Sequence, residues 1–284
     1  MSIPADGASG TPSTGRPAGT EGEGLRVALL GYGAIGRVVA AELRAGRVEG
    51  ATLVAVVNRS EIVDPPVPQL PLERAVEISD VVVECAGADA LRDAVEPVLS
   101  AGRDLVVTSV GALLEPALRA RLDAPGPGRL RCTAGALGGL DLLAAAAAAA
   151  PLESVLIRTT KLAGSLLRPW MDDGERRRLT EATGVVPLFR GTPAEAVRLF
   201  PQSVNVAAAL ALAVDDVDGV VVELHADPSA TVTTHRIEAT GRSGSYCFEV
   251  QHRPSPDNPR TSGVVPFAVL QTLRGMTAAP PLIG

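Results

Sequence analysis

A short glycine-rich turn near the start of the chain constrains the fold more than any other feature. Residues 25–39 read LRVALLGYGAIGRVV, in which Leu25–Leu30 is a short apolar run of residues that favour β-strands. Apolar residues then recur at helical spacing, and Gly31, Gly33 and Gly36 lie between the two patterns. The segment therefore predicts a strand that enters a helix through the spacing G-x-G-x-x-G.

Each glycine of this spacing has a physical explanation. The first allows a tight turn, the second lets the backbone approach a pyrophosphate, and the third lets the helix pack on the strand. The free N–H groups and the partial positive charge of the helix N-terminus then favour the anion. We expect the following residues to bind a dinucleotide: Gly31, Gly33, Ala34, Ile35 and Gly36. A turn with a purely structural role is the alternative.

The residues after the second predicted strand indicate which dinucleotide is bound. That strand is Ala51–Val57, and Asn58, Arg59 and Ser60 follow it, where the adenine ribose of a bound dinucleotide lies. An acidic residue there selects NAD, whereas a neutral residue followed by arginine leaves room and charge for a 2′-phosphate. We therefore predict that NADP(H) is the preferred cofactor, with NAD(H) as the second choice. A polar loop with an incidental arginine is the alternative.

Three more segments, at 80–85, 103–108 and 129–133, have the composition of short buried strands and alternate with helical patterns. Ligands of open parallel sheets bind outside the carboxyl ends of the strands. We therefore expect small residues at two of these ends to border the cofactor: Cys85, Ala86 and Gly87 after the first, and Ser109, Val110 and Gly111 after the second. The glycine-rich segment 134–141 is either a hinge between domains or part of the nicotinamide end of the site.

The pattern changes after residue 152, where two helical patterns are followed by three successive strand patterns that end near residue 252. We therefore predict an α/β protein with two domains. The expected parts are a Rossmann-type parallel-sheet domain over 25–135, a second α+β domain with a mixed or antiparallel sheet over 136–262, and a C-terminal helical segment, 263–284, that can pack back on the first domain.

Composition and charge exclude several classes of function. The chain has no apolar run near the roughly 18 residues that a membrane helix needs, and its net charge of -6 argues against a nucleic-acid partner. Its three cysteines are odd in number and lack metal-type spacing, so we expect small core residues in a reducing cytoplasm and no metal site. Residues 1–24 are rich in Gly, Ser, Thr and Pro and are expected to be a disordered tail.

Two residues are candidates for chemistry. His235 lies within a predicted strand, where a position in a cleft would make it an acid-base group that titrates near neutral pH. Lys161 is the only lysine among 26 basic residues, and lysine is a compact donor whose pKa can be tuned. The alternatives are a solvent-facing histidine and a surface lysine without a function. The other two histidines, His225 and His252, are expected at strand ends on the surface.

Several motifs occur together behind the turn at 31–36. They are the segment AGALGGLD at 134–141, the segment FPQSVNVAAALALA at 200–213, Ala226-Asp227-Pro228, the strand that contains His235, and Asn258-Pro259-Arg260-Thr261-Ser262. In this order the set resembles the L-aspartate dehydrogenase family, and the resemblance covers residues 25–273.

The resemblance implies a Rossmann domain, an α+β domain that dimerises through its sheet, and NAD(P)-dependent interconversion of L-aspartate and iminosuccinate. That reaction leads on to oxaloacetate and ammonia or feeds NAD biosynthesis. The resemblance also implies that His235 is the active-site histidine, that Lys161 and Thr233 bind the substrate, and that Ala136 and Asn205 contact the nicotinamide half of the cofactor. The expected partners are a small amino or imino acid and a second copy of the chain.

Two positions depart from the family pattern. Thr233 stands where the family usually has asparagine, and Leu162-Ala163 follow Lys161 where the family usually has two prolines. A related dehydrogenase of another α-imino acid fits these departures as well. A reductase that resembles dihydrodipicolinate reductase or homoserine dehydrogenase is a further alternative, although it lacks support in 200–213. A non-catalytic dinucleotide-binding protein is the alternative outside enzymes.

Overall fold

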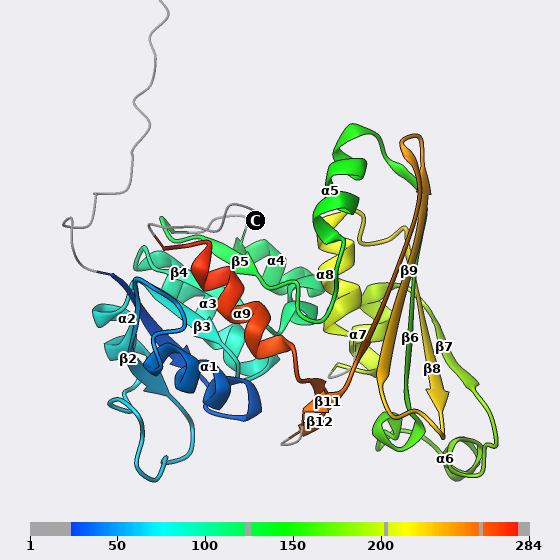
Figure 1. Cartoon of the computed structure of the whole chain (residues 1–284), viewed down its shortest axis with the longest axis horizontal. Coiled ribbons are helices and arrows are strands. Elements are labelled where there is room, and N and C mark those ends of the chain that lie inside the picture. Colours follow the sequence, from blue (N-terminus) through cyan, green and yellow to red (C-terminus); the bar gives the residue numbers. More distant parts are fainter. Residues whose placement is uncertain (1–23, 123–125, 202–203, 256–257, 278–284) are drawn as a thin grey trace, which may run out of the picture.

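Figure 1 shows the computed structural model of the chain, which describes residues 24–122, 126–201, 204–255 and 258–277. The predicted N-terminal tail lies outside these residues apart from Gly24, and so does the end of the predicted C-terminal segment. Two five-stranded sheets organise the described part of the chain. No helix in this part of the chain qualifies as a membrane span.

The first sheet is parallel throughout and has the strand order β2-β1-β3-β4-β5. Its strands are β1 (Leu25–Leu30), β2 (Ala51–Val57), β3 (Val81–Glu84), β4 (Asp104–Val107) and β5 (Leu130–Cys132). The strands β3 and β4 are short apolar runs buried almost completely, as expected of strands that are covered on both faces.

Helices cover both faces of this sheet. On one face lie α1 (Ala34–Arg44) and α9 (Val265–Arg274), whose Val39, Leu43 and Val269 share a core with β1 and β3. The other face packs against α2 (Leu72–Ile78), α3 (Ala88–Ser100), the 3₁₀ helix η1 (Val110–Leu114) and α4 (Pro116–Leu122). The C-terminal helix α9 therefore returns to the first sheet, beside α1 (Figure 1).

The second sheet is mixed and has the strand order β10-β9-β6-β8-β7. Its strands are β6 (Leu152–Leu162), β7 (Val186–Gly191), β8 (Val220–Asp227), β9 (Thr233–Gly241) and β10 (Gly244–His252). The strands β6 and β8 are parallel and the other neighbours are antiparallel. The predicted α/β fold with a parallel sheet and a second mixed sheet is confirmed. The strand β7 was not predicted, because its sequence lacks a clear period-two pattern.

Three helices cover the inner face of the second sheet and separate it from the first sheet (Figure 1). They are α5 (Leu140–Ala149), α7 (Pro193–Leu199) and α8 (Asn205–Ala213). The helix α8 consists almost entirely of small and apolar residues, which lets it pack on both sides. Leu210 and Ala211 face the core of the second sheet, whereas Ala208 and Ala209 belong to the core of the first.

The helix α7 begins with a capping box. Thr192 is its N-cap: the hydroxyl accepts from the N–H of Glu195, and the Glu195 carboxylate accepts from the N–H of Thr192. This capping box satisfies donors that the first turn leaves unpaired.

The remaining short elements are the 3₁₀ helix η2 (Ala163–Leu166), α6 (Asp173–Thr180) and the two strands of a small sheet, β11 (Pro254–Ser255) and β12 (Asn258–Ser262).

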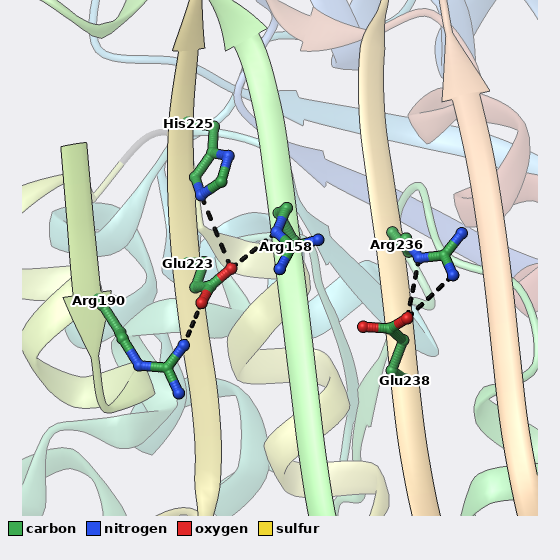
Figure 2. Close-up of polar contacts among 6 residues, drawn as sticks. All are labelled: Arg158, Arg190, Glu223, His225, Arg236 and Glu238. Carbon is green, nitrogen blue, oxygen red and sulfur yellow. Dashed lines mark hydrogen bonds and ion pairs between the residues drawn. The ribbon is translucent and has the colours of Figure 1, made fainter. Parts of the chain in front are cut away.

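The outer face of the second sheet is polar, and no helix of the described residues covers it in Figure 1. Figure 2 shows its central cluster: the Glu223 carboxylate accepts from Nε of Arg158 at 2.7 Å, pairs with Arg190, and lies 3.6 Å from Nε2 of His225. Arg236 pairs with Glu238 on the same strand at 2.9 Å. These pairs neutralise Arg158 and Arg236, which stand opposite each other on β6 and β9.

The structure contradicts the expected positions of two cysteines and one histidine. Cys132 and Cys247 are exposed and do not belong to the core, because Cys132 ends an edge strand and Cys247 points to the polar face of β10. His225 does not lie at a strand end. It is half-buried within β8, where its ring faces Glu223.

Candidate active site

The glycine turn after β1 has three glycines with three different surroundings. Gly31 has a φ of +103°, and a Cβ there would lie within 2.9 Å of the Ala86 backbone. A Cβ on Gly36 would lie 2.1 Å from the carbonyl oxygen of Gly31, so only glycine lets α1 pack this closely on the turn. A Cβ on Gly33 would meet no atom of the described residues within 4 Å.

This open side of the turn fits a dinucleotide pyrophosphate. Gly33 is the N-cap of α1, and no side chain of the described segments caps the helix, so its first N–H groups remain available to an anion. The absence of protein atoms near a Cβ at Gly33 means that this position is not needed for internal packing. A glycine there gives a ligand close access to the backbone, as the spacing predicted.

The loop after β2 lies beside the turn. Oδ1 of Asn58 accepts from the N–H of Tyr32 at 3.2 Å, which ties this loop to the glycine turn. Asn58 and the exposed Arg59 both line the large cavity described below. Ser60 does not line it within the described residues. Its carbonyl oxygen accepts from the side chains of Asn58 and Gln69, which turns this end of the loop inward.

A buried carboxylate fixes the two loops that follow β3 and β4. Oε1 of Glu84 accepts from the N–H groups of Ala86 at 2.8 Å and Gly87 at 2.7 Å, and Oε2 accepts from the N–H of Ser109 at 2.9 Å. The Ser109 hydroxyl also donates to Oε1 at 2.9 Å. Sequence reasoning placed Ala86, Gly87 and Ser109 at the cofactor, but it missed that one glutamate side chain holds them together.

A cavity of about 1430 Å³ extends from the glycine turn to the second sheet. Of the residues predicted for the site, those that line it are Gly31, Gly33, Ala34, Ile35, Asn58, Arg59, Cys85, Ala86, Gly87, Ser109, Val110, Gly111, Ala136, Lys161, Asn205 and His235. The turn thus lies at one end of a space that is shared by both sheets. Its volume accommodates a dinucleotide together with a small substrate.

The far end of this cavity is a polar patch on the inner face of the second sheet. Along β6 the inward positions Val155 and Ile157 are followed by Thr159 and Lys161, and on β9 His235 stands opposite Thr159. Because side chains alternate along a strand, these residues share one face. The inward stripe therefore changes from apolar to polar where it reaches the cavity.

Lys161 and His235 are both buried, with 8% and 2% of their surface exposed. Burial lowers the pKa of Lys161 to about 8, with a contribution from the nearby charge of Arg168. Burial also lowers the pKa of His235 to about 3, with further contributions from Lys161 and His252. The expectation of a histidine that titrates near neutral pH is therefore wrong for the free protein, in which the buried imidazole is neutral.

The histidine at the end of β10 is also part of this region. His252 is half-buried, its ring centroid lies 6.4 Å from that of His235, and its Nε2 donates to the carbonyl oxygen of Ala136 at 2.7 Å. The expected surface position of His252 is therefore wrong, because β10 ends against the segment after β5. Asn205 makes a similar link from α8, where its Oδ1 accepts from the N–H of Gly111 at 3.0 Å.

Three predicted site residues do not line the cavity formed by the described residues. Gly36 packs against the turn, Ser60 lies behind Asn58, and Thr233 is buried opposite His252 on β9. Conversely, Asn258, Thr261 and Ser262 line the cavity from β12. The sequence marks this segment as a motif but gives it no role, because it is more than 200 residues from the turn and only the fold brings it to the cavity.

Comparisons with known proteins agree with this arrangement. Residues 141–276 match the family described as "Aspartate dehydrogenase, C-terminal". Residues 31–125 match the family described as "Homoserine dehydrogenase, NAD binding domain". The two matches divide the chain close to the change in pattern seen in the sequence.

Individual relatives match over nearly the whole chain. The L-aspartate dehydrogenase of Bradyrhizobium diazoefficiens is 36% identical over 266 residues, which cover 89% of this chain and 92% of that protein. The L-aspartate dehydrogenase of Ruegeria pomeroyi is 34% identical, with 91% and 95% covered. The crystal structure of aspartate dehydrogenase from Thermotoga maritima has the same fold, with a TM-score of 0.70 and 24% identity over 92% of this chain and 99% of that chain. The chain belongs to the L-aspartate dehydrogenase family of NAD(P)-dependent amino-acid dehydrogenases.

Proposed function

We propose that the protein oxidises L-aspartate to iminosuccinate with NADP⁺, or reduces iminosuccinate with NADPH. In the oxidative direction the substrate ammonium loses one proton, and a second proton leaves as the hydride is transferred and the C=N bond forms. Water then converts iminosuccinate to oxaloacetate and ammonium. The observation that carries the proposal is the buried pair Lys161 and His235 at the end of a cavity that begins at the glycine turn.

Lys161 supplies the positive charge for a carboxylate of the substrate. With a pKa of about 8 its ammonium group is charged at neutral pH, although burial disfavours that charge. A carboxylate that enters the cavity pairs with the ammonium and relieves this cost. Because Lys161 is fixed on β6 at this end of the cavity, the charged pair also orients the substrate.

His235 carries out the proton transfers. Bound nicotinamide supplies the hydride chemistry at the α-carbon. The imidazole is neutral in the free protein, so it can accept a proton from the substrate ammonium group, and it can return that proton when the imine is hydrolysed. An anionic substrate and its pairing with Lys161 both raise the pKa of His235 from its value in the free protein, which brings proton exchange into the range of the reaction.

The preference for NADP(H) rests on the loop after β2. Asn58 offers no carboxylate to repel a 2′-phosphate, and its amide oxygen is already bound to the N–H of Tyr32. Arg59 is exposed at the cavity wall, where its guanidinium can bind two phosphate oxygens. Both features favour a phosphorylated ribose over an unmodified one.

Aspartate is preferred over other amino acids because the departures from the family pattern lie outside the cavity. In the described chain neither Leu162 nor Ala163 lines it, and Thr233 is buried behind it. None of these three departures therefore lines the cavity formed by the described residues. An amino acid with a different side chain is the second candidate, and a substrate screen distinguishes the two.

The test is to measure initial rates in both directions of the reaction, by the absorbance of the reduced nicotinamide. Purified protein should oxidise NADPH when oxaloacetate and ammonium are both present, and it should reduce NADP⁺ with L-aspartate. The screen includes L-alanine, L-glutamate and L-homoserine with each cofactor. Turnover with one of these and none with aspartate would assign a different substrate. No turnover with any of them would favour a non-catalytic dinucleotide-binding protein.

We also propose that the protein is a homodimer whose copies meet at the outer face of the second sheet. That face carries both signs of charge, with the ion pairs Arg158–Glu223 and Arg236–Glu238 on neighbouring strands (Figure 2). A two-fold interface brings a patch against its own copy, so a patch of mixed sign is complementary to itself. Sedimentation analysis should give twice the mass of the chain, and Glu223→Arg should lower it to the mass of the chain.

A further inference from the structure

We propose that Thr159 is a positioning residue, whose hydroxyl accepts the Nδ1 proton of His235 and so leaves Nε2 unprotonated and directed at the cavity. The proposal rests on the function proposed above, in which His235 exchanges protons with the substrate. It assigns a role to a residue that the sequence pattern could have indicated, since Thr159 precedes Lys161 by two positions on the same strand face.

The geometry of the pair is well defined. Thr159 on β6 and His235 on β9 stand directly opposite each other in an antiparallel pair. Oγ1 of Thr159 lies 2.9 Å from Nδ1 of His235, and both residues are 2% exposed. Threonine has a restricted χ1 angle, so its hydroxyl is a fixed partner for the ring. With Nδ1 held against the sheet, Nε2 is the ring nitrogen that remains for the cavity, which His235 lines.

The position of one proton decides whether this arrangement works. A neutral imidazole carries its proton on one nitrogen only. If that nitrogen is Nδ1, the N–H donates to Thr159 and Nε2 has a free lone pair that can accept a proton. If it is Nε2, the ring cannot act as a base toward the substrate. At 2.9 Å the hydroxyl can accept from an Nδ1–H or donate to a bare Nδ1. The accepting direction is the one proposed, because it alone leaves Nε2 free and also supports the imidazolium that forms when Nε2 is protonated.

A hydroxyl differs from a carboxylate in this position because it is neutral. A carboxylate would stabilise the imidazolium and raise the pKa of His235, whereas a hydroxyl orients the ring without adding charge. The charged or titratable groups that face His235 are Lys161 from β6 and His252 from β10. Both disfavour the imidazolium, so the free enzyme keeps a neutral ring until an anionic substrate arrives.

The first experiment reads the tautomer directly. The chain has three histidines, so ¹⁵N labelling of histidine gives few ring signals, and the signals of His235 are those lost in His235→Asn. In the protein without substrate at neutral pH, we expect a protonated Nδ1 and a bare Nε2. Thr159→Val should move the proton to Nε2, and Thr159→Ser should restore it to Nδ1. A protonated Nε2 in the unmodified protein would overturn the proposal.

The second experiment reads the consequence for turnover. Thr159→Val should lower kcat at least about tenfold, with an unchanged KM for NADPH, because proton transfer is impaired and dinucleotide binding is not. The pH dependence of kcat should shift in the valine variant, and the serine variant should recover most of the lost kcat. Thr272→Val is the matched control, since it removes a hydroxyl that donates to the carbonyl of Ala268 on α9, away from the cavity.

These outcomes separate the two proposals. Equal kcat in Thr159→Val and the unmodified enzyme would overturn the role of Thr159 while leaving the dehydrogenase activity established. If the tautomer results are as expected but no amino acid is oxidised, the function proposed above fails and the pairing of Thr159 with His235 stands. A loss of kcat of the same size in Thr272→Val would assign the effect to general destabilisation and overturn the positioning role.

Discussion

Replacing Lys161 by methionine should stabilise the protein and at the same time remove its binding of a dicarboxylate. Lys161 is 8% exposed, and its pKa falls from 10.5 to about 8 because burial and Arg168 disfavour the ammonium group. Methionine has a similar length and an apolar side chain that adapts to irregular space. The variant keeps the packing of the stem and removes the buried charge.

The size of the effect follows from the pKa. At 1.36 kcal/mol for each pH unit, a fall from 10.5 to about 8 means that the charged form costs the folded protein about 3 kcal/mol at pH 7. The folded pKa is lowered, so the unfolded chain binds more protons between about pH 8 and 10.5, and stability rises with pH across that window. The cost is complete below pH 8 and absent above 10.5.

Urea denaturation measures this directly. At pH 7 we expect Lys161→Met to raise the free energy of unfolding by about 1–3 kcal/mol, and we expect the difference between the two proteins to shrink as the pH approaches 10. Succinate, a dicarboxylate without an amine, should raise the melting temperature of the unmodified protein and leave that of the variant unchanged. If the variant were less stable at pH 7, or if the difference in unfolding free energy did not depend on pH, the idea that burying the Lys161 ammonium group costs stability would be refuted.

Three further substitutions test the rest of the site. Gly33→Val should leave stability nearly unchanged, because a Cβ there meets no described atom within 4 Å. It should raise the Kd for both dinucleotides at least about 100-fold by filling the pyrophosphate position, and retained affinity in a calorimetric titration would contradict this. The control Gly36→Val, whose side chain clashes with Gly31, should fail to fold. Arg59→Ala should weaken NADPH about tenfold and leave NADH unaffected, so equal losses would argue against a 2′-phosphate site. His235→Ala should lower kcat at least about 100-fold with a normal KM for NADPH, and a normal kcat from mildly acidic to alkaline pH would exclude His235 as the acid-base group.

Local patterns in the sequence determined the first sheet and its turn. The three glycines of the turn are constrained by contacts within a few residues or with the adjacent strand, so their spacing predicts their surroundings. The residues at the ends of β3 and β4 were predicted for the same reason, because parallel strands in one sheet place their carboxyl ends together. Resemblance to a family was needed to give Ala136 and Asn205 a place, because the glycine-rich segment around Ala136 left two roles open and Asn205 carries no local signal.

Tertiary structure alone decided the chemistry at the far end of the cavity. Lys161 and His235 were single candidates in the sequence. They share a surface only because β9 pairs antiparallel with β6, although β7 and β8 lie between these strands in the chain. The register of that pairing sets Thr159 against His235, and the end of β10 brings His252 to Ala136. A pKa depends on burial and on neighbouring charges, which are properties of the packed molecule. The sequence therefore determined which residue types were present. Only packing could keep the imidazole of His235 neutral and make the charged form of Lys161 unfavourable in the folded protein.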